Sequence, residues 1–149
     1  MSGDGSTVAI GAYGNDGSAG GAGHTRIFFY NQGIDNWIQM GGDIDGEATN
    51  DFSGHSVTLS RDGTTVAVGA YGNDVSGSNS GHVRVFKYHQ IDSSWVQMGE
   101  DIDGEAAGDF FGYGTISLSE DGRKVAIGAM FNDGNGPDAG HTRVFEFSC

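Results

Sequence analysis

The sequence is poor in several residue types, and each scarcity excludes a kind of protein. One cysteine and one proline occur in 149 residues, so an intrachain disulfide is impossible and neither a collagen-like nor a polyproline chain fits. Basic residues are also few: seven Lys and Arg stand against 20 Asp and Glu, and the formal net charge is −13. Nucleic acid and anionic membranes draw most of their binding energy from basic side chains. We therefore expect no nucleic-acid partner.

Long hydrophobic runs are missing as well. No apolar segment approaches the roughly 18 residues of a membrane-spanning helix, so membrane insertion is not expected. The first residues, Met1 to Gly5, show no signal-peptide pattern, and a secreted form would carry its signal outside this sequence. No window has the apolar period of a helix, which favours an all-β chain.

Glycine is abundant, with 28 residues, and it falls at repeated positions. The segment Val-Ala-Ile-Gly-Ala at residues 8–12 returns with small changes at 66–70 and 125–129, which are 58 and 59 residues further on. The segment Gly-His-Thr-Arg-Ile-Phe at 23–28 returns with the same spacing at 81–86 and 140–145. Such a period indicates a tandem array in which each unit buries its apolar face against a neighbour. We divide the chain into a partial first unit (1–42), a second (43–100) and a third (101–149).

The middle unit predicts four strands, at residues 57–60, 64–70, 82–88 and 95–98, separated by glycine or Asx turns such as Asp62-Gly63. Four short antiparallel strands in a repeat near 60 residues are typical of a β-propeller blade. Counted along the chain, two, then four, then four strands are expected, or about two and a half blades. Valine and isoleucine in the second strand of each unit should be buried: Val66, Val68, Val125 and Ile127.

These motifs together resemble the FG-GAP (phenylalanine-glycine/glycine-alanine-proline) repeat. The third unit carries the resemblance best, with Asp-Phe-Phe-Gly at 109–112, Ile-Ser-Leu-Ser at 116–119, and the Gly-Ala and Gly-His segments that follow. The family builds the propeller of integrin α-subunits and of many secreted adhesion-type proteins. The resemblance therefore implies a non-enzymatic protein at an extracellular or cell-surface location.

Three departures from the family pattern limit what is carried over. Tyr13, Tyr71 and Met130 stand where the family has the proline of Gly-Ala-Pro, and one unit reads Phe52-Ser53-Gly54. The calcium loop of the family is reduced to Asp62-Gly63 and Asp121-Gly122. Since calcium takes six to eight oxygen ligands, we do not expect calcium at that position.

Acidic segments offer a different metal site. Alternating carboxylates beside Gly46 or Gly104 can converge on calcium, or they can cap backbone amides in solvated turns. The two copies of this candidate site are Asp43, Asp45, Glu47 and Asp51, and Asp101, Asp103, Glu105 and Asp109.

Other polar and aromatic residues recur once per unit, which favours structural roles over catalysis. His24, His82 and His141 should make equivalent contacts, and an arginine two residues later shares their strand face. Two further sets have either a structural or a ligand-binding role. Trp37 and Trp95 pack within blades or stack on glycans; the Asn-Asp pairs form turns or bind a ligand, namely Asn15 and Asp16, Asn73 and Asp74, and Asn132 and Asp133.

The sequence thus favours a structural or adhesive repeat protein that assembles with itself. Closed propellers need roughly four to eight blades, so this array should form a homo-oligomeric ring or a filament through its terminal units. The alternative is a lectin-like propeller module that binds glycan, with or without calcium, in clefts beside Trp37 and Trp95 or the acidic segments. A hydrolase would need an unrepeated acid/base pair, and the sequence offers none.

Overall fold

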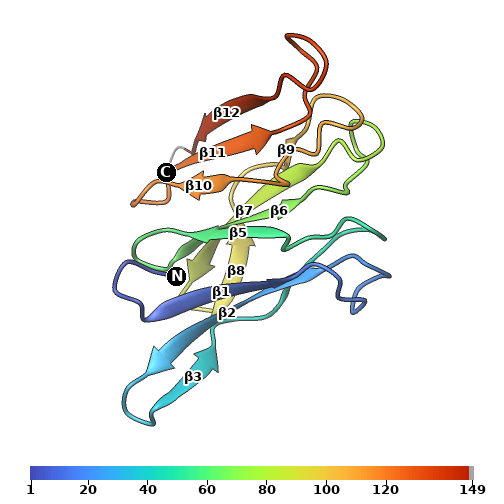
Figure 1. The fold of residues 1–149 in the computed structure, drawn as a ribbon. Helices are drawn as coiled ribbons and strands as arrows, with labels where there is room; N and C mark the ends of the chain where they lie inside the picture. The colour runs from blue at the N-terminus through green and yellow to red at the C-terminus, as the bar shows by residue number, and fades with distance from the viewer. Residues whose placement is uncertain (148–149) are drawn as a thin grey trace.

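The computed structural model describes residues 1–147, and this part of the chain consists of strands and turns (Figure 1). The all-β fold class is confirmed. The single cysteine, Cys149, lies outside the described residues. No helix that could cross a membrane is found between residues 1 and 147.

Twelve strands form three separate antiparallel sheets. The first contains β1 (Thr7–Ala12), β2 (His24–Asn31), β3 (Asn36–Gln39) and β4 (Ile44–Asp45). The second contains β5 (Ser56–Leu59), β6 (Thr65–Ala70), β7 (His82–His89), β8 (Ser94–Gln97) and β9 (Ile102–Asp103). The third contains β10 (Ile116–Leu118), β11 (Lys124–Ala129) and β12 (His141–Glu146).

The four strands expected in the middle unit coincide with β5 to β8 within one or two residues. The strand count differs, because the described sheets have four, five and three strands where two, four and four were expected. The short strands β4 and β9 explain part of the difference. They pair with β2 and β7, so each acidic segment completes the preceding sheet. Their isoleucines, Ile44 and Ile102, anchor them there, at 5% and 9% exposure.

The second sheet lies between the other two and is covered on both faces (Figure 1). Val66, Val68 and Phe86 pack with Ile27 and other residues of the first sheet. The opposite face of the second sheet packs on the third, where the buried residues are Ala67, Val83, Val85, Ile102, Phe111, Ile116, Val125, Ile127 and Ala129. The predicted burial of the valines and isoleucine of β6 and β11 is confirmed, since none is more than 1% exposed. Alternation along each strand separates the two faces.

Glycine permits the close approach of neighbouring sheets. A Cβ at Gly69 would lie 2.6 Å from the carbonyl oxygen of Gly112, which precedes the third sheet. A Cβ at Gly11, the same position in the first sheet, would overlap the carbonyl oxygen of Gly54. Gly128 is the third copy, and only the carbonyl oxygen of Thr115 lies near it, at 3.8 Å. The array is therefore open beyond Gly128, and the three described sheets do not close into a ring.

Substituting the same glycine in two repeats should give different results. We expect Gly69→Ala to lower the free energy of unfolding by about 1–3 kcal/mol, because the added methyl group overlaps the Gly112 backbone. Gly128→Ala should change it by less than ~0.5 kcal/mol, because its methyl group meets open space. Urea denaturation of both variants tests the difference. Equal losses would contradict the packing of the second sheet on the third.

Candidate functional site

The turns at the calcium position of the family are closed by hydrogen bonds within the chain. The Ser60 hydroxyl donates to Asp62 Oδ1 at 2.7 Å, and the Thr65 amide donates to Ser60 Oγ. Ser119 and Asp121 form the same turn. A third copy, which the sequence reasoning missed, precedes β1 at Ser2 and Asp4, and the signal was the Ser-x-Asp-Gly motif at the same repeat position.

Hydrogen bonds to these carboxylates also shift their acidity. The Ser6 amide and the hydroxyls of Ser2 and Ser6 lower the pKa of Asp4 to about 2. The Ser119 hydroxyl, followed by the Arg123 amide, lowers the pKa of Asp121. These carboxylates are thus held as hydrogen-bond acceptors of the turn, which agrees with the expectation that no calcium binds at this position.

Histidine and aspartate face one another at the end of the first two sheets. His24 Nδ1 lies 3.6 Å from Asp43 Oδ2, and His82 Nδ1 lies 3.7 Å from Asp101 Oδ2. The antiparallel pairing sets this geometry, because it places the histidines of β2 and β7 opposite Asp45 and Asp103. The expected equivalence of the histidines therefore holds for these two copies.

His141 has a different partner. Its Nδ1 lies 3.7 Å from Glu105 Oε2, which belongs to the segment between the second and third sheets. The described third sheet ends with β12 and has no strand equivalent to β4 or β9. The third histidine thus contacts the acidic segment of the preceding unit instead of one in its own sheet.

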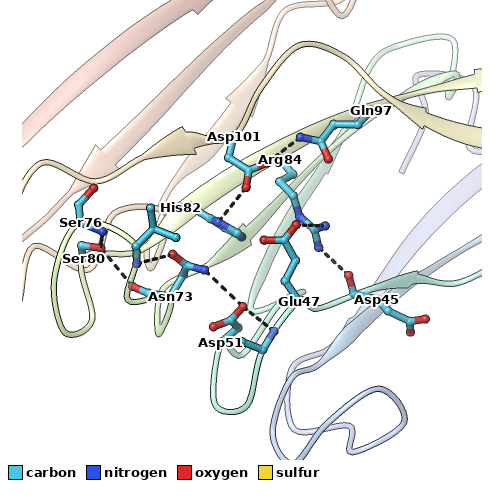
Figure 2. A network of polar contacts seen from close by, with 12 residues as sticks. Asp45, Glu47, Asp51, Asn73, Ser76, Ser80, His82, Arg84, Gln97 and Asp101 are labelled. Carbon is cyan, nitrogen blue, oxygen red and sulfur yellow. Dashed lines mark hydrogen bonds and ion pairs between the residues drawn. The ribbon is translucent and has the colours of Figure 1, made fainter.

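Arginine links each following sheet to the acidic segment before it. Arg84 donates to Glu47 Oε1 at 3.1 Å and to the carbonyl oxygen of Asp45 at 2.6 Å, as Figure 2 shows. Arg143 repeats both contacts with Glu105 and the carbonyl group of Asp103. Sheets that are 58 or 59 residues apart are therefore joined by the same pair of polar contacts.

The first arginine has no preceding sheet to contact. Arg26 instead forms a bidentate pair with Asp43 of its own sheet, with Nε and Nη2 at 2.9 and 2.8 Å from the carboxylate oxygens. The hydrogen bond from Arg26 is the main cause that lowers the pKa of Asp43. One arginine position thus serves two purposes, which depend on its place in the array.

The four carboxylates of the first acidic segment are divided between two groups. Asp43 and Asp45 lie with His24, whereas Glu47 and Asp51 lie with His82. In both groups, one potential ligand atom from each residue lies within 4.8 Å of the others. A third group contains His82, Asp101 and Asp103. Histidine, which the calcium hypothesis did not include, is thus common to all three groups.

The last carboxylate of each acidic segment is held by its own loop. Asp51 and Asp109 are each 3% exposed. Asp51 accepts from the amide of Ala48, and Asp109 accepts from that of Ala106. Each also lies within hydrogen-bond distance of an asparagine amide, Asn73 for Asp51 and Asn132 for Asp109.

The Asn-Asp pairs that follow β1, β6 and β11 close their own loops. Asn15, Asn73 and Asn132 each accept from the amide two residues further on. The aspartates accept from the amide five residues further on, at 2.7 Å in each case; they are Asp16, Asp74 and Asp133. Turn formation therefore engages one side-chain oxygen of every member of these pairs.

The two tryptophans have different environments. Trp95 lies between the first two sheets, and its Nε1 donates to the carbonyl oxygen of Met40 at 2.6 Å. Trp37 lies on the outer face of the first sheet, is 41% exposed, and packs on Tyr30 at a centroid distance of 5.4 Å. The tilted contact with tyrosine is common to both, since Tyr88 packs on Trp95 at 5.2 Å.

A polar cleft of about 270 Å³ opens between the first and second sheets. Its lining includes Asp43, Asp45, Arg84 and Trp95. It combines an indole ring with carboxylate oxygens and a guanidinium group, so it offers both an apolar wall and hydrogen-bonding groups to a ligand.

A row of aromatic rings, which the sequence reasoning also missed, links the loops of successive repeats. Tyr71 stacks on Phe52 with centroids 5.2 Å apart and contacts Tyr113 edge-on at 4.9 Å. His55 stacks on Tyr113 at 4.6 Å. The signal was present in the tyrosines that replace the family proline. The row contains Tyr13, Phe52, His55, Tyr71, Phe110, Tyr113 and Phe131.

Burial controls the protonation of His82. The imidazole is 1% exposed, and burial, followed by the nearby Arg84 charge, lowers the pKa of His82 below 6.5 despite the opposing effect of Asp101, Glu47 and Asp51. The neutral ring is therefore favoured in the folded protein, which is the form that can bind a metal.

We expect NMR titration of the His82 ring signals to give a midpoint below 6.5. The folded-state pKa is lower than the unfolded value, so folding releases a proton between the two. The His82 contribution to stability is complete above 6.5 and is lost as the pH falls through the folded-state pKa. A midpoint at or above 6.5 would contradict the burial of this ring.

Comparison with known protein families agrees with these repeats. Residues 44–86, which run from β4 into β7, match the family model described as FG-GAP repeat. No curated protein matches the sequence. The family resemblance inferred from the sequence is confirmed, and residues 44–86 of this chain are an FG-GAP repeat.

Proposed function

We propose that this chain is a non-enzymatic assembly module, and that copies of it stack head to tail into a β-propeller-like ring or a filament. FG-GAP repeats are generally non-enzymatic and typical of extracellular proteins, which supports a structural or adhesive role outside the cell. One observation carries the proposal: the two outer faces of the array present the same residue positions that form its internal interfaces.

The outer face of the first sheet has the side chains of an interface. Val8, Ile10, Arg26, Phe28 and Trp37 occupy the positions of residues that turn the second sheet toward the first. The counterparts in the second sheet are Val66, Val68, Arg84, Phe86 and Trp95. Ile10 is 53% exposed, whereas its counterpart Val68 is 1% exposed. The first sheet thus exposes apolar area that the same fold buries one repeat later.

The outer face of the third sheet is the complementary surface. Thr142 and Val144 occupy the positions of Val83 and Val85, which are buried between the second and third sheets. Val144 is 66% exposed. A hollow of about 660 Å³ lies on this side of the sheet, and Gly128 and Thr142 are part of its lining.

A second copy of the chain fits both faces. The first sheet of one copy can lie on the third sheet of another as the second sheet lies on the first, and Arg26 already has Asp43 as its partner. Burying an exposed valine or isoleucine contributes about 1.5–3 kcal/mol per side chain. Head-to-tail contacts of this kind produce a ring when the rotation closes and a filament when it does not.

A charge on one docking face should prevent assembly. We expect the wild-type chain to form oligomers at micromolar concentration and Val144→Glu to be monomeric, because the substitution buries an unpaired carboxylate at the junction. The matched control is Val75→Glu, since Val75 is 68% exposed in a loop and lies on neither face. Light scattering coupled to size-exclusion chromatography measures the mass. A folded wild-type monomer, or dissociation by both variants, would contradict the proposal.

The polar cleft supports a second candidate function, in which the chain is a lectin-like module that binds glycan. Trp95 supplies a planar wall for a sugar ring, and Asp45 and Arg84 supply an acceptor and donors for its hydroxyl groups. Calcium bound at Asp43 and Asp45 would make this binding calcium-dependent.

Calorimetric titration with a panel of neutral oligosaccharides, with and without millimolar calcium, tests this function. We expect Asp45→Asn to weaken binding by at least ~10-fold, or about 1.4 kcal/mol, and exposed Asp92→Asn to leave it unchanged. Calcium should also raise the melting temperature. An unchanged melt would contradict the calcium component, and no binding across the panel would contradict the glycan function.

A further inference from the structure

The buried imidazole of His82 has a ring nitrogen without a hydrogen-bond partner. His82 is 1% exposed, and its Nδ1 atom is buried. The closest carboxylate oxygen paired with it, Asp101 Oδ2, is 3.7 Å away, which is beyond hydrogen-bond range. Leaving such a group unpaired is costly, so its presence requires an explanation.

A second unpaired atom lies beside it. Asp103 is directly opposite His82 in the pairing of β7 with β9, and Asp103 Oδ1 is also buried without a hydrogen-bond partner. One potential ligand atom each from His82, Asp101 and Asp103 lies within 4.8 Å of the other two. Two orphaned polar atoms and a third ligand therefore converge on one point at the end of the second sheet.

Packing of the sheets leaves Asp101 available. In the first sheet, the equivalent Asp43 is held by the bidentate pair with Arg26. In the second sheet, Arg84 turns away to Glu47 and to the Asp45 carbonyl group (Figure 2). Asp101 keeps one hydrogen bond, from Gln97 Nε2 to Oδ1 at 2.6 Å, which orients the carboxylate while Oδ2 faces His82.

We propose that His82, Asp101 and Asp103 form a binding site for a divalent first-row transition cation, with zinc as its representative. One imidazole with two carboxylates favours such a cation over calcium or magnesium, which prefer oxygen ligands alone. The charge balance agrees. Glu47 and Asp51 also lie by His82, so four carboxylates surround the site against the single guanidinium group of Arg84.

Zinc titration of the full-length chain, followed by calorimetry and by NMR of the histidine rings, tests this proposal. We expect one site of micromolar affinity or tighter, with a shift of the His82 ring signals and a rise in melting temperature on adding zinc. His82→Gln and Asp103→Asn should each weaken zinc binding by at least about 100-fold. The second variant is nearly isosteric, so it keeps the test valid if the first fails to fold.

His89→Gln is the matched control, because His89 is exposed on the same strand and has no carboxylate group assigned to it. It should bind zinc as the wild type does. Absence of zinc binding, equal losses in His89→Gln and His82→Gln, or displacement of zinc by equimolar calcium would each overturn the proposal.

Arg26→Ala provides a gain-of-function test at the same position in the first sheet. Removing the guanidinium releases Asp43 beside His24 and Asp45, so we expect the zinc stoichiometry to rise from one to two. A stoichiometry that stays at one would overturn the inference that arginine placement determines which copy binds the cation.

Discussion

The fold depends on one constraint: each sheet buries its faces against another copy of the same sheet. The middle sheet meets this condition on both sides, and every residue of β6 is buried. Close approach requires a position without a side chain, and Gly69 lies against the backbone of the next repeat there. Because the units are copies, a face that is buried in the middle of the array is exposed at its ends, as Val85 and Val144 illustrate.

The polar contacts follow from the same constraint. Arginine at one repeat position reaches back to the preceding acidic segment where such a segment exists, as Arg84 does, and folds onto its own sheet where none is described, as Arg26 does. The local charge distribution therefore changes from copy to copy although the residues do not. Surface ion pairs are weak individually, but Arg84 is only 7% exposed, so its contacts with Glu47 and Asp45 are screened less.

Periodicity and alternation in the sequence predicted the strands of the middle repeat, their burial and the family. These properties depend on local pattern, which one repeat contains in full. The sequence did not predict that the acidic segments close the preceding sheet, because that depends on Ile44 and Ile102 finding partners across the array. It also grouped Asp43 with Glu47, whereas the fold assigns them to different histidines.

Repetition in the sequence favoured a structural role for the histidines, on the ground that a functional residue occurs once. The structure weakens this ground, because the three copies are not equivalent. His24 lies by an aspartate that arginine already holds, His82 by one that remains available, and His141 by a glutamate. Position in the array can thus confer a distinct chemistry on one member of a repeated set. Function in such proteins is therefore best sought where identical residues have different neighbours.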